Sequence, residues 1–325
     1  MGDSATEVTI DGRVVRLTNL DKVLWPKGGY TKAHLIRYYA SIAPVILPHL
    51  AGRPLTVTRF PDGIHGESFY QKNAPGHTPP WVRTYRAVGE YPDPASDADE
   101  ESGINYVVCE DTATLAWLAN QACIELHPWL STAHAPEKPD RIVIDLDPDP
   151  PAGFGQARRI AFVVKDVLDG MGLRGYPKLS GATGVHIVVP IRPEYPYNVT
   201  VRLAELIARI VADLLPGEAT VERRVKDRRG RVYVDHLQNL PGKTIVAAYS
   251  VRPREVPTVS MPVSWEELAA CEPEDFTIDT VPELVARGDR AARVLYDLQD
   301  ITPWVEELAV PRVPSGSSSR TSPPS

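Results

Sequence analysis

One short segment, Arg141–Asp147 (RIVIDLD), constrains the fold more than any other part of the chain. Its residues alternate as in a β-strand, so Ile142, Ile144 and Leu146 face a core while the aspartates point the other way. The prolines that directly follow end the strand. A strand with one fully apolar face predicts a sheet with helices packed on it.

Strand-like and helix-like patterns alternate around this segment, which predicts an α/β (α+β) fold. Helices are expected over 31–47, 111–126, 160–168 and 203–214, and strands over 141–147, 185–190, 231–237 and 243–251. The last two strands are predicted to form a hairpin, because the short sequence Gln-Asn-Leu-Pro-Gly connects them.

Composition places the chain among ordinary globular proteins, with 43% hydrophobic and 24% charged residues over 325 positions. The Ser/Pro-rich stretch 313–325 is expected to be a disordered tail. The acidic stretch 93–102 is expected to be a solvated loop. No apolar run approaches the roughly 18 residues of a membrane span. The three cysteines form no CxxC motif, which indicates a reducing cytoplasm.

Three aspartates form the first candidate site. Asp145 and Asp147 leave the same face of one strand, and Asp235 ends another strand. Carboxylate oxygens in such a group are ligands for hard divalent cations, and a two-metal site of this kind can act on phosphates. The alternative is that the aspartates are simply solvated strand ends.

A glycine-containing turn, Ser180–His186 (SGATGVH), forms the second candidate site. Gly181 and Gly184 let the backbone approach an anion closely, and the Ser180 hydroxyl and His186 ring can donate to a phosphate. Arg252 is placed after the expected hairpin, where it could reach a triphosphate. An ordinary turn before a strand remains the alternative.

Further basic and aromatic residues favour contact with nucleic acid. Lys22 and Lys32 flank the start of the first helix, where an anion is stabilised, and Phe69–Tyr70 could stack on a base. The basic run 222–231 is a candidate phosphate-contacting ribbon or a solvated hairpin. The net charge of −7 shows that any such contact depends on local clusters, because the whole chain is acidic.

Together, several motifs resemble the polymerase domain of bacterial ligase D, a member of the archaeo-eukaryotic primase superfamily. These motifs span about Val14 to Leu298 and read LTNLDKVLWPKGGYTKAHLIRYY, ESFYQKN, IELHPW, VIDLDPD, LSGATGVHIVVPI and VYVDHLQNLPGKTIVAAYSVRPR. The resemblance implies an N-terminal arm over 1–13, a primase-type catalytic core over 14–300 and a C-terminal segment over 301–325 that ends in the Ser/Pro-rich tail. The core would have a central mixed or antiparallel sheet flanked by helices, with an N-terminal α/β part over 14–135. In this arrangement 136–300 would bind metal and nucleotide.

The resemblance also implies roles for individual residues. The metal-binding and catalytic triad would be Asp145, Asp147 and Asp235. The incoming nucleotide would be bound by Ser180, Gly184, His186, Lys178, Arg252, His127 and Gln238. The 5′-phosphate of DNA would be bound by Lys22, Lys32 and Asn19, and the template base would stack on Phe69 and Tyr70.

The implied function is template-directed nucleotidyl transfer that fills gaps and extends ends in bacterial non-homologous end joining, with a preference for ribonucleotides. Two Mn²⁺ or Mg²⁺ ions would assist it. The implied partners are DNA ends, gapped duplex with a 5′-phosphate, NTP and dNTP substrates, Ku and a DNA ligase, in the nucleoid-containing cytoplasm and without a membrane.

Three other functions remain open from the residues. A catalytically quiet module could bind 5′-phosphate DNA ends, and a phosphohydrolase could use the same metal site. A glycosidase fits poorly, because two acids on one strand leave no room for a sugar ring between them. The chain contains no Lys-x-Asp-Gly motif, so we expect no nick sealing.

Overall fold

The structure is a computed structural model that describes residues 5–88 and 103–309. The predicted acidic loop over 93–102 and the predicted tail therefore lie outside the described residues, apart from the segment 301–309. No helix within the described ranges is long and apolar enough to cross a bilayer.

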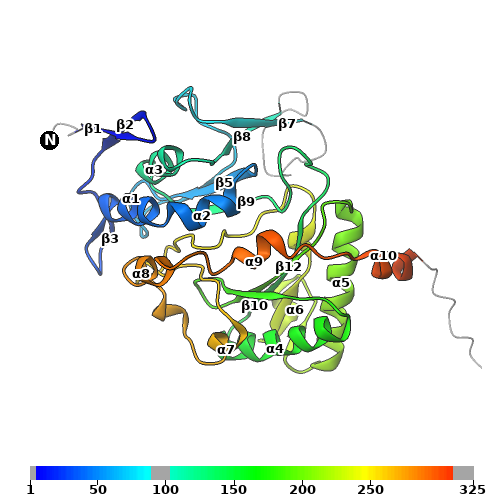
Figure 1. Ribbon diagram of the computed structural model, residues 1–325. Coiled ribbons are helices and arrows are strands. Elements are labelled where there is room, and N and C mark those ends of the chain that lie inside the picture. Colours follow the sequence, from blue (N-terminus) through cyan, green and yellow to red (C-terminus); the bar gives the residue numbers. More distant parts are fainter. Residues whose placement is uncertain (1–4, 89–102, 310–325) are drawn as a thin grey trace, which may run out of the picture.

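The first of two large sheets is formed by the N-terminal part of the chain. It has the order β6-β5-β8-β7, and β9 also pairs with β5. Helix α3 packs against β9 and against α1 and α2, which lie beside this sheet (Figure 1). The elements are β1 (Ala5–Ile10), β2 (Arg13–Thr18), β3 (Val23–Trp25), β4 (Tyr30–Thr31), α1 (Lys32–Ser41), α2 (Ala43–Leu50), β5 (Pro54–Arg59), β6 (Phe69–Gln71), β7 (Thr84–Ala87), β8 (Ile104–Val108), α3 (Thr112–Asn120) and β9 (Cys123–Pro128).

The second sheet has the order β11-β12-β10-β14-β13 and is antiparallel except for the parallel pair β13–β14. Ile142, Ile144 and Leu146 are fully buried in the main hydrophobic core, together with residues of α4 and α5 that cover this face. The predicted mixed sheet flanked by helices is confirmed. Its elements are β10 (Arg141–Pro148), α4 (Phe154–Gly170), β11 (Tyr176–Leu179), β12 (Val185–Pro190), α5 (Tyr197–Leu214), β13 (Ala219–Thr220), α6 (Val225–Arg228) and β14 (Val232–Asp235).

The C-terminal segment crosses between the two sheets and joins them (Figure 1, orange). The Tyr38 hydroxyl donates to the carbonyl oxygen of Tyr249 (2.8 Å), and Tyr249 in turn donates to Asp289 (2.7 Å). Nε2 of His49 lies 2.8 Å from the same aspartate. The elements after β14 are η1 (Leu237–Asn239), α7 (Trp265–Leu268), η2 (Pro273–Asp275), α8 (Val281–Val285), α9 (Ala292–Tyr296) and α10 (Thr302–Ala309).

The two N-terminal helix predictions need correction. The helix expected over 31–47 begins after Thr31 as predicted, but it is divided at Ile42, because Pro44 in the next turn has no N–H to donate. The helix expected over 111–126 is wrong beyond Asn120. Ala122 turns the chain with a φ of 56°, and the following residues pair with β5 as strand β9.

The predicted hairpin is also wrong. Strand β14 is already paired on both sides, with β10 and β13, so it has no free edge for a partner strand. Residues 243–251 instead run along the junction of the sheets with scattered bonds. The amide of Ala247 donates to Leu126 (2.8 Å), and that of Tyr249 donates to Ser260 (2.7 Å).

Candidate active site

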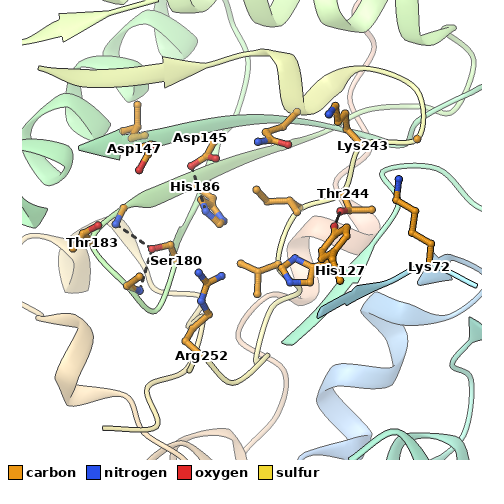
Figure 2. A pocket seen from close by; sticks show the side chains of 18 of the residues that line it. Lys72, His127, Asp145, Asp147, Ser180, Thr183, His186, Lys243, Thr244 and Arg252 are labelled. Carbon is orange, nitrogen blue, oxygen red and sulfur yellow. Dashed lines mark hydrogen bonds and ion pairs between the residues drawn. The ribbon is translucent and has the colours of Figure 1, made fainter. Parts of the chain in front are cut away.

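A cavity of about 540 Å³ opens between the two sheets (Figure 2). The first sheet contributes Tyr70 and His127, and the second contributes the ends of β10 and β12 with the turn before β12. The polar residues that line it are Tyr70, Lys72, His127, Asp145, Asp147, Ser180, Thr183, His186, Gln238, Lys243, Thr244 and Arg252. The structure therefore gathers most of the predicted nucleotide-binding residues and two of the three predicted metal ligands around one cavity.

Strand register aligns four ionisable side chains in a row across the second sheet. Lys178 on β11 lies opposite His186 on β12, which lies opposite Asp145 on β10, and Asp145 lies opposite Asp235 on β14. Directly opposite positions place their side chains on the same face of a sheet. The predicted metal site therefore forms one end of a cross-strand row that begins with a lysine.

Two of the three aspartates are bound by protein donors. Asp235 accepts hydrogen bonds from the Tyr233 hydroxyl (3.1 Å), the Leu237 amide (2.7 Å) and the Gln238 amide group (3.1 Å). Asp147 accepts from Arg228 (2.9 Å), whose guanidinium lies over the ring of Tyr233. Within the described part of the chain, no three His, Cys, Asp or Glu side chains already form a metal site.

The electrostatics nevertheless fit a divalent cation. Burial, and after it the charges of Asp235 and Asp147, raise the pKa of Asp145 to about 7. A cation beside these carboxylates would remove the repulsion, and an all-oxygen donor set suits Mg²⁺ or Mn²⁺. Binding would require Asp147 and Asp235 to exchange their present donors for the ion.

The turn before β12 is built around the Ser180 side chain. Its hydroxyl oxygen accepts hydrogen bonds from the amides of Ala182 (3.1 Å) and Gly184 (3.0 Å), so its own proton is available to a ligand in the cavity. Gly184 has no room for a side chain, since a Cβ there would lie 2.5 Å from the carbonyl oxygen of Leu146. The turn is therefore held directly against β10.

Arg252 and the two histidines form the basic wall of the cavity. Nε2 of His186 lies 3.4 Å from Asp145, and burial lowers the pKa of the His186 ring well below its usual value, assisted by Lys178 and Arg252. Burial likewise lowers the pKa of His127. The lowered pKa values favour the neutral form of both imidazoles, and the Arg252 guanidinium completes this wall.

Glu125 is a residue of the site that the sequence reasoning missed. Its carboxylate lies 3.1 Å from Nε of Arg252 and 3.4 Å from Nε2 of His127. Burial opposes ionisation, but the hydrogen bond with His127 and the charge of Arg252 lower the pKa of Glu125 to about 2. An acid two positions before His127, in an otherwise apolar strand, was the available signal.

The structure places the two predicted aromatic residues on different sides of β6. Tyr70 lines the cavity, with its ring edge against His127 and its hydroxyl 2.5 Å from that of Thr244. Phe69 is half-exposed and lies beneath the Arg59 guanidinium, 5.1 Å away. Only Tyr70 therefore belongs to the cavity wall.

The predicted 5′-phosphate residues are not among those that line the cavity: Asn19 and Lys22 precede β3, and Lys32 begins α1. Their backbones meet, because the Lys22 amide donates to Asn19 (3.0 Å) and the Lys32 amide donates to Lys22 (2.8 Å). The side chains diverge. The Lys22 amine reaches an exposed partner, Asp62 (2.7 Å), whereas the Lys32 amine is buried and donates to the carbonyl oxygen of Asn120 (3.0 Å).

Comparison with known proteins gives consistent similarities. A family model described as the primase-polymerase domain of LigD matches residues 31–291. The chain is 37% identical over 275 residues to the bifunctional non-homologous end joining protein LigD of Bacillus subtilis, covering 84% of this chain and 43% of that protein. It is 34% identical over 300 residues to the multifunctional LigD protein of Mycolicibacterium smegmatis, covering 92% of this chain and 38% of that one. The chain thus spans less than half the length of these relatives.

One solved structure is similar along nearly its whole length. The polymerase domain of Mycobacterium tuberculosis ligase D, in complex with DNA, matches with a TM-score of 0.77 and 32% sequence identity. The match covers 88% of this chain and 99% of that domain.

Proposed function

The chain belongs to the family of LigD primase-polymerase domains, and we propose that it fills gaps and extends ends at DNA double-strand breaks during non-homologous end joining. The reaction is template-directed nucleotidyl transfer, with ribonucleotides preferred over deoxyribonucleotides. The relatives named for end joining and the similar domain bound to DNA support this assignment.

The single observation that carries the proposal is the composition of the cavity. Carboxylates that could bind a cation, a turn that could bind a triphosphate and a basic wall all face the same space of about 540 Å³. Nucleotidyl transfer needs all three, because an attacking hydroxyl, a triphosphate and developing negative charge must be brought together. A module that only binds DNA ends needs none of the three aspartates.

In the proposed mechanism, Asp145, Asp147 and Asp235 bind two Mn²⁺ or Mg²⁺ ions. Such ions lower the pKa of a primer hydroxyl and offset the charge of the triphosphate. The Ser180 turn donates hydrogen bonds to the phosphates from its hydroxyl and backbone. Arg252 and the His186 N–H stabilise negative charge that develops on the transferred group.

The other predicted residues complete the substrate contacts. His127, Gln238 and Gly184 line the nucleotide site, and Phe69 and Tyr70 stack on the template base. Lys22 binds the 5′-phosphate at the far side of a gap, next to Asn19 and Lys32. Ku and a DNA ligase are the proposed protein partners, in the nucleoid-containing cytoplasm.

Primer extension tests this function. The substrate is a short gap with a downstream 5′-phosphate, and Mn²⁺ is compared with Mg²⁺, and NTPs with dNTPs. We expect templated addition with release of pyrophosphate, and a loss of at least about 1000-fold in Asp145→Asn/Asp147→Asn. The matched control is Asp166→Asn/Asp213→Asn on exposed faces of α4 and α5, which should extend like the wild type.

Two outcomes would contradict this proposal and favour another function. Tight binding to the DNA end without nucleotide addition under either metal would favour the end-binding module. Cleavage of the strand without pyrophosphate release would favour a phosphohydrolase.

A further inference from the structure

Lys178 is buried behind the wall of the cavity and is not among its lining residues. Its amino group lies 2.9 Å from Nδ1 of His186, 3.0 Å from the carbonyl oxygen of Val246 and 2.6 Å from the Ser260 hydroxyl. A direct contact with nucleotide would require it to leave all three partners. The prediction that Lys178 binds nucleotide therefore needs a different physical explanation.

Hydrogen-bond donors and acceptors around Lys178 determine which atom carries each proton. The Val246 carbonyl can only accept. The Ser260 hydroxyl donates its own proton to the carbonyl oxygen of Leu179 (2.9 Å), so it accepts from the lysine. An ammonium group has three protons, and the third points to Nδ1 of His186, which then accepts with its lone pair.

The other nitrogen of His186 faces the catalytic carboxylates. With Nδ1 as the acceptor, a neutral imidazole carries its proton on Nε2, which lies 3.4 Å from Oδ1 of Asp145. The opposite tautomer would require the lysine to accept a hydrogen bond from Nδ1–H, and an ammonium group has no lone pair with which to accept one. The cross-strand register from Lys178 through His186 to Asp145 fixes this order of groups.

We propose that Lys178 is a positioning residue, which holds the His186 ring with its Nε2–H directed toward Asp145 and the cavity. The position and tautomer of His186 do not depend on the proposed function. Only the statement that its Nε2–H contacts a nucleotide rests on that function. Outer residues of this kind commonly set the tautomer and orientation of a functional histidine.

The cost of burying this lysine supports a specific role. Burial and the nearby Arg252 guanidinium lower its pKa well below the usual value, and the Asp145 carboxylate acts in the opposite direction. A buried ammonium is tolerated only where its protons are bonded, and here all three have an acceptor. An apolar residue would fill the same space at less cost, but it could not hold Nδ1.

The first test is independent of polymerase activity. Two-bond ¹H–¹⁵N spectra of the full chain with ¹⁵N-labelled histidines report which ring nitrogen carries the proton. His186 is assigned by the loss of its signals in His186→Gln. We expect the Nε2–H tautomer in the wild type and in Asp145→Asn, where only Lys178 holds the ring. In Lys178→Met the Nδ1 signal should shift, because its hydrogen bond is lost.

The wild-type spectrum alone can overturn the proposal. A proton on Nδ1 of His186, or an Nδ1 signal that does not change in Lys178→Met, would show that Lys178 does not set the tautomer. If Lys178→Met does not fold, Lys178→Gln replaces it, since the shorter amide should hold Nδ1 only partly. Lys165→Met on the exposed face of α4 is the matched control and should leave the His186 signals unchanged.

The second test is a double-mutant cycle on nucleotide addition. We expect Lys178→Met to lower kcat/KM about tenfold in the wild type. In a His186→Gln background the same change should have an effect within about twofold, because the lysine acts through that ring. Equal losses in both backgrounds would contradict the positioning role. A chain that adds no nucleotide would contradict the proposed function and leave the spectroscopic test intact.

Discussion

The Asp145 carboxylate shows how a single residue can link metal binding to stability. Its pKa is raised from 3.8 to about 7, so between these values the folded, metal-free protein binds a proton that the unfolded chain releases. Stability from this group therefore falls as pH rises through that window. A cation bound to the carboxylates should remove this loss of stability at higher pH.

The free energy of unfolding in urea, measured as a function of pH, tests this prediction. Between about pH 5 and about pH 8, the metal-free wild type should lose stability relative to Asp145→Asn. Mn²⁺ should stabilise the wild type more at the higher pH, because protons no longer compete for the carboxylate. An identical pH dependence in the two proteins would contradict the assigned pKa shift.

Glu125 contacts both Arg252 and His127, so its loss should impair nucleotide addition and stability. Glu125→Gln removes the charge between Arg252 and His127, and we expect kcat/KM for nucleotide addition to fall about tenfold, or about 1.4 kcal/mol. Stability should fall by about 2 kcal/mol, because Arg252 loses its buried counter-charge. Glu110→Gln, at a surface pair with Arg83, is the matched control. Unchanged nucleotide kinetics in Glu125→Gln would exclude this role.

Single residues were predictable where a motif fixed both their type and their spacing. Asp145, Ser180 and His186 line the cavity as their positions in the sequence suggested. The position of Glu125 beside His127 was a signal in the sequence, but its pairing with Arg252 was not, because Arg252 is distant in sequence. The diverging amines of Lys22 and Lys32 could not be predicted for the same reason, since their partners are Asp62 and Asn120.

At the scale of elements, the turn before β12 depends on a glycine where the backbone lies directly against β10. A Cβ at Gly184 would lie 2.5 Å from the Leu146 carbonyl oxygen, so Gly184→Ala must push the turn off β10. We expect a loss of about 2 kcal/mol in urea unfolding, together with weaker nucleotide binding. Gly155→Ala near the start of α4, where nothing lies within 4 Å, should be neutral or stabilising by up to about 1 kcal/mol. Similar losses in both variants would disprove the steric explanation.

Elements were predictable when local periodicity and tertiary pairing agreed. The strand at 141–147 and the helices of α4 and α5 were identified because their apolar faces meet in the same core. The segment after Asn120 was misassigned, because its short apolar run fits a helix and a strand equally well and only the free edge of β5 decides.

At the scale of the whole molecule, the cavity and the predicted 5′-phosphate site are separate. A mutation at the 5′-phosphate site should therefore leave nucleotide addition itself intact. Lys22→Ala should lower nucleotide addition at a gap with a 5′-phosphate about fivefold, which would abolish the preference for this gap. Addition at an unphosphorylated gap should stay unchanged. Asp62→Asn should strengthen the preference for the 5′-phosphate, because it removes the carboxylate that forms an ion pair with the Lys22 amine. Lys27→Ala, also exposed near β3, is the control. Equal losses on both gaps would place Lys22 in the general DNA-binding surface instead.

Neither sheet forms the cavity alone. The first sheet contributes Tyr70 and His127, the second contributes the aspartates, and the C-terminal segment holds the two sheets together. A division of the chain near residue 135 would therefore separate the two walls of the site.

Strand β10 pairs on one side with β12 and on the other with β14. Inserting or deleting one residue before Asp145 would exchange its faces, placing the aspartates under α4 and α5 and aliphatic side chains in the cavity. An insertion or deletion within this strand is therefore expected to destroy the site, whereas a substitution keeps the register. Protein engineers who wish to reshape the cavity for larger nucleotides should instead vary the length of 240–243, which lies outside every helix and strand and ends before the contacts of Thr244 with Tyr70 and of Val246 with Lys178.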